Sequence, residues 1–488
     1  GGLPAFSIVG LPDSAVRESG DRVRAAVKNL GFKWPDRRIT VNLAPADIRK
    51  SGPVYDLPLL LAVLTASGQL EEPPADTAFL GELALDGTLR PVSGVLPMAL
   101  EAAARGIRSL YVPAENAAEA AEAGGDALQI YPAHTAGEVV NALRGDLPIP
   151  PTKAIPFDPS EFWQNIPDFA DVMGQPLARR AMVIAAAGGH NALLIGAPGT
   201  GKSMLAKRLP GILPPLTREE AVETTKIYSI AGQLPKGRGL ITARPFRSPH
   251  HSASAVALAG GGAQFRPGEC SLANCGVLFL DELPEFSRES LEILRQPLED
   301  GQITVSRAAG SATYPSRFQL VAAMNPCKCG YYGHPTRPCT CSLSAVRQYR
   351  SRVSGPLLDR IDLCVEMDPV AFDELHSAAP AESSAVLRQQ VIAARTLQSA
   401  RYSAPGFEGI RCNAQLSAGQ VRRVCRMTPA AEQLLRASYD TLGLSARAHD
   451  RILRVARTIA DLAGKRLLDE DALLEALQYR AQEKIGEI

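Results

Sequence analysis

The spacing of apolar residues along the second half of the chain changes from helical periodicity to short uninterrupted runs. Mostly apolar runs at 191–195, 276–280, 318–324 and 361–367 are typical of buried strands. Apolar positions at helical spacing occupy 176–187 before the first run, and 434–442, 447–462 and 469–480 after the last. This pattern predicts an α/β core followed by a helical region.

The first 146 residues alternate between the two kinds of spacing. Strands are predicted at 6–9, 38–43 and 110–112, and helices at 14–29, 57–67 and 96–104. Asp86-Gly87 stands between apolar residues and predicts a hairpin turn. We expect a separate α+β domain over 1–146, because 488 residues are too many for one hydrophobic core.

A proline-rich segment separates this domain from the rest. Five prolines lie between residues 147 and 160, and they favour an extended, semi-rigid linker, assigned to 147–165. We expect the α/β core to span 166–372. The remaining residues, 373–488, are expected to form a helical region that begins with a long helix at 381–401.

A glycine-rich turn joins the first buried strand to the start of a helix. Its sequence is typical of a P-loop, in which backbone N–H groups surround nucleotide phosphates, the Lys reaches the outer phosphates and the Ser hydroxyl ligates Mg²⁺. A glycine-rich turn without a ligand is the alternative, and the strand before it and the helix after it disfavour that alternative. The expected ATP-binding residues are Gly196, Ala197, Pro198, Gly199, Thr200, Gly201, Lys202 and Ser203.

An acidic pair follows the second apolar run. Asp281 and Glu282 come directly after 276–280, at the carboxyl end of a strand, where open α/β sheets bind ligands. Asp281 would hold the Mg²⁺ shell and Glu282 would polarise the attacking water. Asn325 ends the third run, where its amide can hydrogen-bond the γ-phosphate or the water. Two acids after a strand are often only a solvated turn, but together with a P-loop they favour a catalytic site.

Four cysteines in a short loop rich in Gly and Pro form a candidate metal site. Cys327 and Cys329 are followed, after nine residues, by Cys339 and Cys341. Four thiolates suit tetrahedral Zn²⁺ in a closed, structural site, although Cys-x-Cys spacing is less common there than Cys-x2-Cys. Disulfides are the alternative, and His334 is a spare ligand.

Charge, hydropathy and cysteine content indicate which partners and which compartment to expect for this chain. The net charge of +1 argues neither for nor against nucleic acid, although residues 411–466 carry 11 Lys and Arg residues against 4 Asp and Glu residues. No run of about 18 apolar residues predicts a membrane span. Nine cysteines and a start at Gly-Gly-Leu-Pro, without Met or an apolar leader, predict a reducing cytoplasmic location and a few missing N-terminal residues.

One resemblance lies in the first domain. The sequence at 81–95, with 103–107 and Val112-Pro113 after it, resembles the proteolytic domain of Lon-type proteases, which use a Ser nucleophile activated by a Lys. Local alignment places Val54 at the Ser position and Leu96 at the Lys position. The resemblance therefore implies a Lon-protease-like α+β scaffold that is catalytically inactive, a binding or assembly module. A cryptic hydrolase that uses Ser51 or Lys50 is the alternative, but no partner base is identifiable.

The order of the later motifs resembles that of AAA+ P-loop ATPases. In that family a segment such as 169–175 packs on the nucleotide base, and Asn325 matches the sensor-1 residue. Arg360, in Gly-Pro-Leu-Leu-Asp-Arg, matches the arginine finger that completes a neighbouring subunit's site, so the active unit would be an oligomer. A surface ion pair is the alternative for Arg360. In the helical lid, Arg447 is the first choice for the sensor-2 arginine and Arg454 the second, and the sequence leaves open whether it acts within one chain or on a neighbour.

Two hairpins are predicted as insertions in the core. One is a turn at Gly260-Gly261-Gly262 flanked by a strand at 256–259, and the other runs from 303–307 through Ala309-Gly310 to 312–314. Hairpins at both places are typical of the AAA+ branch that includes magnesium chelatase subunits and MCM-type helicases. With the Lon-like domain and Asp-Glu-Leu-Pro-Glu-Phe at 281–286, the chain from Leu3 to about Arg480 resembles the ComM (YifB) family of magnesium-chelatase-like ATPases.

This resemblance implies an ATP-driven hexameric motor, a branch-migration helicase that acts on single-stranded or branched DNA in natural transformation and homologous recombination. Its hairpins would hold the phosphate backbone in a central channel. The candidate DNA-binding residues are Arg244, Arg247, Arg266 and Arg307. The alternative is a magnesium-chelatase-like or chaperone-like ATPase that remodels a protein partner, and a nucleotide-dependent scaffold is a third possibility. The implied cofactors are ATP, Mg²⁺ and Zn²⁺.

Overall fold

Two structural units share the chain. The computed structural model describes residues 5–45, 49–125, 127–262, 265–307, 310–370 and 381–479. One unit consists of residues 1–158 and 218–241, and the other of residues 159–217 and 242–488. Residues 218–241 were predicted to belong to the α/β core, whereas the structure groups this segment with the first unit. Leu3, Ala309 and Arg480, which mark the ends of the resemblance and a hairpin turn, lie outside the described residues.

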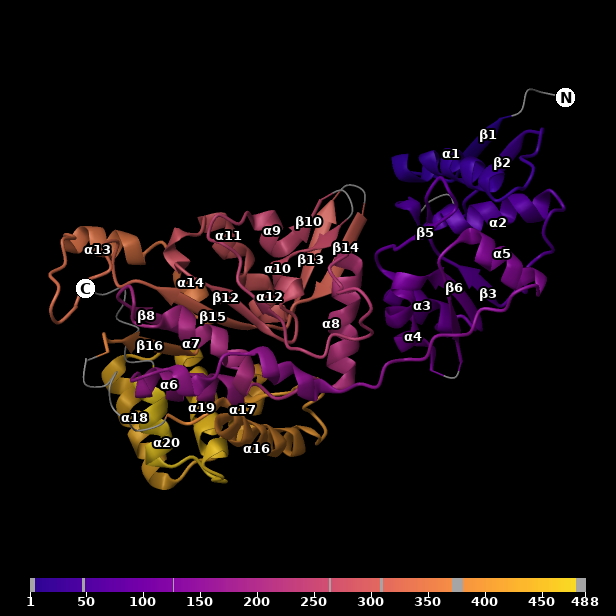
Figure 1. Ribbon diagram of the computed structural model, residues 1–488. Helices are drawn as coiled ribbons and strands as arrows, with labels where there is room; N and C mark the ends of the chain where they lie inside the picture. The colour runs from indigo at the N-terminus through magenta and orange to yellow at the C-terminus, as the bar shows by residue number, and fades with distance from the viewer. Residues whose placement is uncertain are drawn as a thin grey trace. The chain divides into compact units, whose positions relative to one another are not determined.

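The first unit is built of short sheets and helices (Figure 1). A three-stranded parallel sheet has the order β3-β6-β7, β1 pairs with β2 in parallel, and β4 pairs with β5 across the turn predicted at Asp86-Gly87. The strands are β1 (Phe6–Val9), β2 (Ile39–Asn42), β3 (Thr77–Phe79), β4 (Glu82–Leu83), β5 (Leu89–Arg90), β6 (Ser109–Pro113) and β7 (Gln129–Ala133). The helices are α1 (Ser14–Asn29), α2 (Asp56–Ala66), α3 (Val95–Ala104), α4 (Ala117–Gly124), α5 (Ala136–Arg144) and α8 (Arg218–Ala231).

Helix α8 is part of the first unit because buried polar groups on α4 and α3 bind it. The Ser229 hydroxyl donates to Glu119 Oε2 at 2.6 Å, and the Ser229 carbonyl accepts from Gly94 N at 2.9 Å. Glu119 is almost fully buried, so this hydroxyl supplies a hydrogen bond that a buried carboxylate needs. The unit defined by 1–158 is therefore completed by a segment that comes sixty residues later in the chain.

The positions aligned with the Lon catalytic pair lie in apolar or backbone-bonded surroundings. Val54 belongs to a single 3-10 turn, Pro53–Tyr55, and Leu96 is fully buried in α3. Lys50 is buried with its ammonium group donating to the Pro45 carbonyl, whereas Ser51 is exposed. The nearby buried carboxylate of Asp56 is bound by Arg22 Nε at 2.7 Å.

The second unit contains a five-stranded parallel sheet in the order β16-β8-β15-β12-β9. Alternate residues of each central strand enter different cores: Leu194 and Phe279 face one core, and Leu193 and Leu278 face the other. Burial on both faces explains why these strands are uninterrupted apolar runs in the sequence. The strands are β8 (Ala192–Gly196), β9 (Phe246–Arg247), β12 (Val277–Leu280), β15 (Gln319–Met324) and β16 (Leu363–Met367).

Helices cover both faces of this sheet (Figure 1). The helices α6, α16 and α19 pack together with one face, and α9, α10 and α11 lie over the other. The helices of the second unit are α6 (Pro176–Gly188), α7 (Lys202–Arg208), α9 (Ala255–Ala259), α10 (Glu269–Leu272), α11 (Arg288–Ile293), α12 (Arg295–Asp300), α13 (Leu343–Arg350), α14 (Gly355–Leu358), α16 (Ser384–Tyr402), α17 (Ala418–Val424), α18 (Pro429–Leu442), α19 (Ala446–Leu462) and α20 (Glu470–Gln478).

Both predicted hairpins are present, with two corrections. The strand β13 (Gln302–Arg307) pairs with β14 (Gly310–Pro315), and β10 (Gly260–Gly261) pairs with β11 (Arg266–Pro267). The strand predicted at 256–259 is wrong, because these residues form helix α9, and Gly260 and Gly261, predicted in the turn, form the strand β10. The Ser254 hydroxyl accepts from Ala257 N and caps this helix, a local signal that an apolar run alone does not carry.

A buried polar network ties the C-terminal helices to the amino end of the sheet. His190, fully buried, lies 3.0 Å from Asp362 Oδ2 through Nδ1 and 2.8 Å from Thr458 Oγ1 of α19 through Nε2. Asn413 bridges Thr458 and Asp461 at 2.9 Å each. Because every member has partners, this network can fix the helical region on the sheet without leaving a polar group unpaired.

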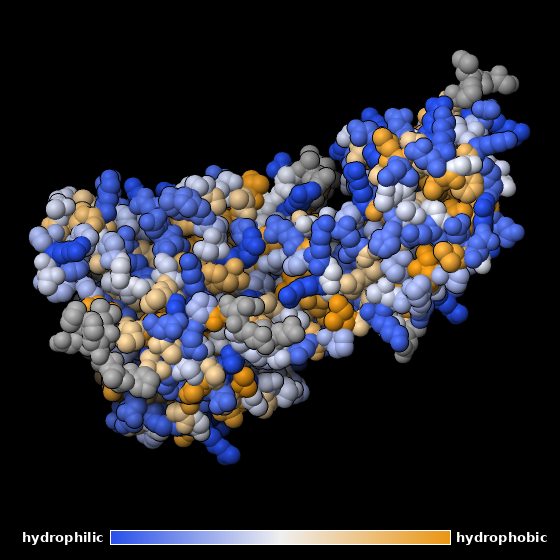
Figure 2. All heavy atoms as spheres, in the orientation of Figure 1, coloured by the Kyte–Doolittle hydropathy of each residue, from blue (hydrophilic) through white to orange (hydrophobic). Residues whose placement is uncertain are grey.

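In the part of the chain that the structure describes, every helix is too short or too polar to cross a lipid bilayer. On the face shown in Figure 2, hydrophilic residues predominate and apolar residues form small scattered groups.

Candidate functional site

The P-loop joins β8 to α7 at the carboxyl end of the sheet. Gly199 and Gly201 have φ angles of +85° and +91°, in the left-handed region that L side chains rarely adopt. The Thr200 hydroxyl, buried between them, donates to the Ala197 carbonyl at 3.0 Å. Glycine at these two positions therefore lets the loop curl tightly around its own backbone.

The predicted P-loop lysine contacts the predicted sensor residue. Lys202 Nζ donates to Asn325 Oδ1 at 3.2 Å and to the carbonyls of Gly196 and Ala197 at 2.6 and 2.9 Å. Burial lowers the pKa of Lys202, and the nearby carboxylates of Asp281 and Glu282 partly oppose this effect. A buried ammonium group with three oxygen acceptors is well placed to exchange these oxygens for those of a phosphate.

The predicted magnesium ligands also meet. Ser203 Oγ donates to Asp281 Oδ2 at 2.5 Å, and Asp281 Oδ1 accepts from Glu282 N at 3.0 Å. Ser203 comes from the start of α7, which follows β8, and Asp281 comes directly after β12, so strands on either side of β15 supply them. A hydroxyl beside a carboxylate is an oxygen pair of the kind that Mg²⁺ uses together with phosphates. These residues fit a Mg²⁺–nucleotide complex.

Glu282 has an uncommon backbone conformation and a histidine as its partner. Its φ of +52° and ψ of +47° lie in the left-handed region, which is uncommon for a residue with a side chain. Its Oε2 lies 3.0 Å from His251 Nδ1. The His251 ring lies 4.1 Å, between centroids, from the ring of His250 and is tilted by 35° to it, and His250 Nδ1 lies 2.9 Å from Ser252 Oγ.

His251 is a site residue that the sequence analysis missed. It follows β9, the neighbour of β12 in the sheet, so parallel pairing brings it to the edge where Glu282 lies. Thirty residues separate the two in the sequence, and β9 is too short to be visible as an apolar run. The signal that could have found it is the tandem His250-His251 itself, since the chain has only seven histidines.

The segment predicted to pack on the base begins in the core and ends beside the P-loop. Phe169 and Val172 are buried in the second unit. Gln175 Nε2 donates to the Asp368 carbonyl at 2.5 Å and lies 3.5 Å from the Thr200 carbonyl. Residues 169–175 thus lead the chain from the core to the nucleotide-binding loop.

Arg360 lies at the opposite edge of the sheet from the P-loop. Its carbonyl accepts from Asn191 Nδ2 at 2.8 Å, and Asn191 directly precedes β8, so Arg360 stands at the amino ends of β8 and β16. Its guanidinium binds Glu299 Oε1 at 2.6 Å, a hydrogen bond that lowers the pKa of Glu299. The structure therefore separates this arginine from the P-loop of its own chain.

The sensor-2 candidates are held away from the P-loop as well. Arg447 is 81% exposed, with a guanidinium nitrogen 4.0 Å from Asp359 Oδ2. Arg451, one turn later and almost fully buried, binds Asp359 Oδ1 at 3.2 Å. Arg454 donates to the Ala414 carbonyl at 3.0 Å. Asp359 precedes Arg360, so Arg447 and Arg451 share its edge of the sheet.

The four DNA-binding candidates fall into two groups. Arg244 donates to the carbonyls of Pro214, Cys275 and Pro215 at 2.6, 2.6 and 3.1 Å, and Arg247 makes two 2.6 Å bonds to the Glu269 carboxylate. These two are engaged inside the second unit. Arg266 and Arg307 are exposed on the two hairpins.

The hairpins pack on each other. Tyr314 Oη donates to the Phe265 carbonyl at 2.6 Å, and a methyl group at Gly261 would lie 3.7 Å from an Arg307 guanidinium nitrogen. Arg266 and Arg307 thus belong to one two-hairpin surface, whereas Arg244 and Arg247 do not.

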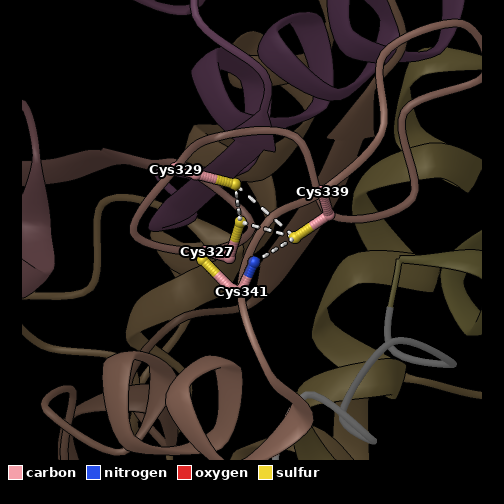
Figure 3. Close-up of side chains that lie close together, drawn as sticks. All are labelled: Cys327, Cys329, Cys339 and Cys341. Carbon is pink, nitrogen blue, oxygen red and sulfur yellow. Dashed lines mark hydrogen bonds between the residues drawn. The ribbon is translucent and has the colours of Figure 1, made fainter.

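The four predicted zinc ligands come together (Figure 3). Cys327 Sγ lies 3.3 Å from Cys329 Sγ and 3.6 Å from Cys339 Sγ, and all four sulfurs, with Cys341, lie within 4.8 Å of one another. Zinc–sulfur bonds of about 2.3 Å in a tetrahedron place sulfurs about 3.8 Å apart, so this cluster fits a single ion. All four thiols are free rather than disulfide-bonded. His334 stands outside the cluster, where its Nδ1 accepts from the Thr336 and Arg337 backbone.

Comparisons with known proteins match three successive parts of the chain to families described as a magnesium chelatase subunit. The families described as "Magnesium chelatase, subunit ChlI", "Subunit ChlI of Mg-chelatase" and "Magnesium chelatase, subunit ChlI C-terminal" match residues 168–375, 1–116 and 381–480. The chain is 44% identical over 489 residues to the competence protein ComM of Haemophilus influenzae, covering 99% of this chain and 93% of that protein. It is 44% identical over 493 residues to the uncharacterized protein YifB of Escherichia coli, with the same coverage of each. The magnesium-chelatase 38 kDa subunit of Rhodobacter capsulatus is 27% identical over 177 residues, which are 32% of this chain and 50% of that protein.

Proposed function

Because the chain belongs to the ComM and YifB family of magnesium-chelatase-like AAA+ ATPases, we propose that it is an ATP-driven DNA motor. In this proposal it is a hexameric, cytoplasmic branch-migration helicase that acts in natural transformation and homologous recombination. The name of the Haemophilus relative, a competence protein, supports a role in DNA uptake.

The contact between Lys202 and Asn325, next to that between Ser203 and Asp281, carries the ATPase part of the proposal. Bound ATP and Mg²⁺ would supply the phosphoryl group and the charge that neutralises it. Lys202 would bind the outer phosphates, and Ser203 and Asp281 would hold the metal. Glu282 would orient and polarise water, and Asn325 would bind the γ-phosphate or that water.

Arg360 and Arg447 support an oligomeric site. Both lie at the edge of the sheet opposite the P-loop, where a neighbouring subunit's nucleotide can be reached more readily than the chain's own. Arg360 would stabilise the charge of the transition state across the interface, and it must leave Glu299 to do so. Arg447 would act on the neighbour as the sensor-2 residue, with Arg454 as the second choice.

The two-hairpin surface supports DNA as the partner. Exposed guanidinium groups on adjacent hairpins can bind successive phosphates of one strand. Arg266 and Arg307 are therefore the first candidates for DNA contacts. Arg244 and Arg247 are proposed to support the base of this region through their carbonyl and carboxylate contacts.

The first domain and the cysteine cluster complete the proposal. Residues 1–146 would serve as a catalytically inactive assembly module, joined through 147–165 to the core at 166–372 and the lid at 373–488. Cys327, Cys329, Cys339 and Cys341 would hold one structural Zn²⁺. Elemental analysis should then find about one zinc per chain, and purified protein without zinc or another metal would contradict this assignment.

The test of the motor is ATP hydrolysis with and without DNA. We expect single-stranded and forked DNA to stimulate hydrolysis and the protein to unwind branched substrates in an ATP-dependent way. With a slowly hydrolysed ATP analogue present, DNA should also promote assembly of single chains into the proposed hexamer. A rate of ATP hydrolysis that DNA does not change, together with absence of unwinding, would contradict the proposal.

A protein-remodelling ATPase is the second candidate function, and the match of residues 168–375 to a magnesium chelatase subunit favours it. This function predicts hydrolysis stimulated by a protein partner and indifferent to DNA. The same assay therefore separates the two candidates.

A further inference from the structure

The cysteine loop is a direct continuation of the strand that carries the sensor residue. Asn325 ends β15, Pro326 follows, and Cys327, the next residue, is fully buried. Asn325 Oδ1 accepts from Lys202 Nζ. The first thiol is thus two residues from a side chain that touches the P-loop lysine.

A second contact joins the cysteine loop to the P-loop. A Cβ atom built on Gly330 would lie 2.7 Å from Pro198 Cδ and 2.9 Å from Pro198 Cγ, distances that real Cβ atoms do not adopt. Gly330 comes directly after Cys329, has a φ of +88°, and its N–H donates to the Cys327 carbonyl at 3.0 Å. The turn that presents two of the four thiols therefore presses its backbone against the proline ring of the nucleotide-binding loop.

The other side of the cysteine loop rests on helix α13. Arg350 Nε donates to the Pro326 carbonyl at 3.0 Å, and its guanidinium lies 5.2 Å from the centre of the Tyr332 ring. Arg350 thus holds the loop at points on either side of Cys327 and Cys329. The second half of the loop returns to the first pair at the sulfur cluster, where Cys339 Sγ lies 3.6 Å from Cys327 Sγ and 3.5 Å from Cys329 Sγ.

We propose that one thiolate-bound metal ion of the zinc class closes this loop against Pro198, so that metal occupancy sets the affinity of the P-loop for nucleotide. The inference rests on the proposed function in one respect, since it takes residues 196–203 to be the nucleotide site. The bound ion holds Cys329, and with it Gly330, at the distance at which the Pro198 ring is supported. Loss of the ion frees the turn and lets the P-loop relax.

Two glycines of the same loop allow a matched test. Gly330 and Gly333 both have left-handed φ angles, +88° and +77°, but a Cβ at Gly333 meets nothing within 4 Å. Gly330→Ala and Gly333→Ala therefore impose the same backbone strain, and only the first drives a methyl group into Pro198. Affinity is measured with a fluorescent ADP analogue on the full chain, and zinc content and melting temperature are measured on each variant.

We expect Gly330→Ala to weaken nucleotide binding by at least about fivefold, the size that overpacking of a close contact produces. Gly333→Ala should bind as the unsubstituted chain does. Pro198→Ala by itself removes the ring against which the turn rests, so its nucleotide affinity should no longer depend on the bound metal. Equal affinity of the two glycine variants, or a Pro198→Ala chain whose affinity still falls when the metal is removed, would overturn the proposal.

Metal removal tests the same link without a substitution. The unsubstituted chain is treated with a chelator, returned to buffer with Mg²⁺, and assayed for nucleotide affinity before and after addition of Zn²⁺. We expect affinity to fall by a similar factor and to return with Zn²⁺, while circular dichroism shows a folded chain. Unchanged nucleotide affinity in a folded, metal-free chain would contradict the inference. Failure of the proposed nucleotide site looks different, because the untreated chain would then bind no nucleotide or Lys202→Ala would bind it equally well.

Discussion

At the scale of single residues, the candidate site assigns different surroundings to two neighbouring carboxylates. Asp281 faces the Ser203 hydroxyl, whereas the left-handed backbone of Glu282 turns its carboxylate toward His251. That conformation costs about 1–2 kcal/mol for a residue with a Cβ. Such strain is retained where a side chain must point in one particular direction, as at active sites.

Glu282→Gln is the first prediction at this scale. An amide can keep the shape of the side chain but cannot take up a proton from water, so turnover should fall by about 10²-fold or more. Affinity for ATP should stay unchanged, because Lys202, Ser203 and Asp281 are untouched. Steady-state hydrolysis and nucleotide binding provide the two measurements. Glu285→Gln, which changes a nearby acid paired with Arg352, is the control and should hydrolyse ATP normally.

His251→Ala is expected to raise basal turnover. The imidazole 3.0 Å from Glu282 Oε2 competes with water for that carboxylate, and an exposed pair of this kind is worth up to ~1 kcal/mol, or about fivefold in rate. The change should appear in kcat and not in KM for ATP. His250→Ala, which alters the neighbouring ring, tests whether the effect belongs to the contact between His251 and Glu282. A fall in kcat for His251→Ala would show instead that the histidine supports catalysis.

The residues of the P-loop and the acidic pair could be predicted because each stands next to its own strand in the sequence. Asn325 could be predicted as a candidate for the same reason, whereas its contact with Lys202 was not predicted. His251 could not, because its role depends on which short strand lies beside β12, and β9 has only two residues. Long apolar strands are visible in a sequence, whereas the neighbours of a sheet edge are set by tertiary pairing.

At the scale of elements, the two hairpins form one surface although 34 residues separate their nearest strands, β11 and β13. Both hairpins were predicted from strand-like segments and glycine-containing turns, but the first was placed too early in the sequence, with its strand at 256–259 and its turn at 260–262. Helix α9 was not, since Val256 to Ala259 is an apolar run that suits either structure and only the Ser254 cap decides for a helix. The contact between the hairpins comes from Tyr314 and Phe265, which no local pattern connects.

Arg307→Ala tests the two-hairpin surface. Removing one exposed guanidinium should weaken DNA binding to a similar degree for all sequences and reduce the slope of log affinity against log salt by about 0.7 for single strands. Hydrolysis without DNA should not change. Fluorescence anisotropy over a series of salt concentrations measures the slope. Arg105→Ala, an exposed arginine paired with Glu101 in the first unit, should leave the slope unaltered.

Asp461→Ala tests the buried network that holds α16 and α19 together. The Asp461 carboxylate is fully buried and binds Arg401 at 2.5 Å and Arg457 at 3.0 Å, so its removal leaves the buried guanidinium of Arg457 and the partly buried guanidinium of Arg401 without their counterion. We expect a loss of about 3–5 kcal/mol in the free energy of unfolding. Thermal or denaturant unfolding monitored by circular dichroism measures it. Asp440→Ala, at an exposed position on α18, should change stability by less than about 0.5 kcal/mol.

At the scale of the whole molecule, the candidate residues are divided between two edges of one sheet. The P-loop, Asp281 and Asn325 lie at the carboxyl edge, while Arg360 and Arg447 lie at the amino edge. In the proposed oligomer, these two edges would be the two halves of each interface, and a ring of identical chains would bring the unlike halves together. The sequence indicated this division only through the family resemblance, because the position of Arg360 depends on strand order.

Mixing two inactive variants tests whether Arg360 of one chain completes the ATP site of another chain. Lys202→Ala lacks the phosphate-binding ammonium group and Arg360→Ala lacks the proposed finger, so each should hydrolyse ATP poorly by itself. In a random one-to-one mixture, about one quarter of the interfaces would pair an intact P-loop with an intact Arg360, and hydrolysis should recover to about that extent. A mixture as inactive as its components would indicate that Arg360 does not act across an interface. Arg352→Ala is the control for changes in surface charge.

The segment 218–241 gives the chain an unusual connectivity. The polypeptide passes between the two units three times, after residues 158, 217 and 241. A cut in the proline-rich stretch would therefore produce a nicked protein rather than two separate pieces, since the N-terminal fragment stays attached through the buried bonds of Ser229 to Glu119 and Gly94. For the same reason, the first unit cannot be separated from the second at a single position in the sequence. A version of the first unit expressed alone would need α8 added to it, and deleting residues 1–158 would leave α8 in the second unit without its packing partners.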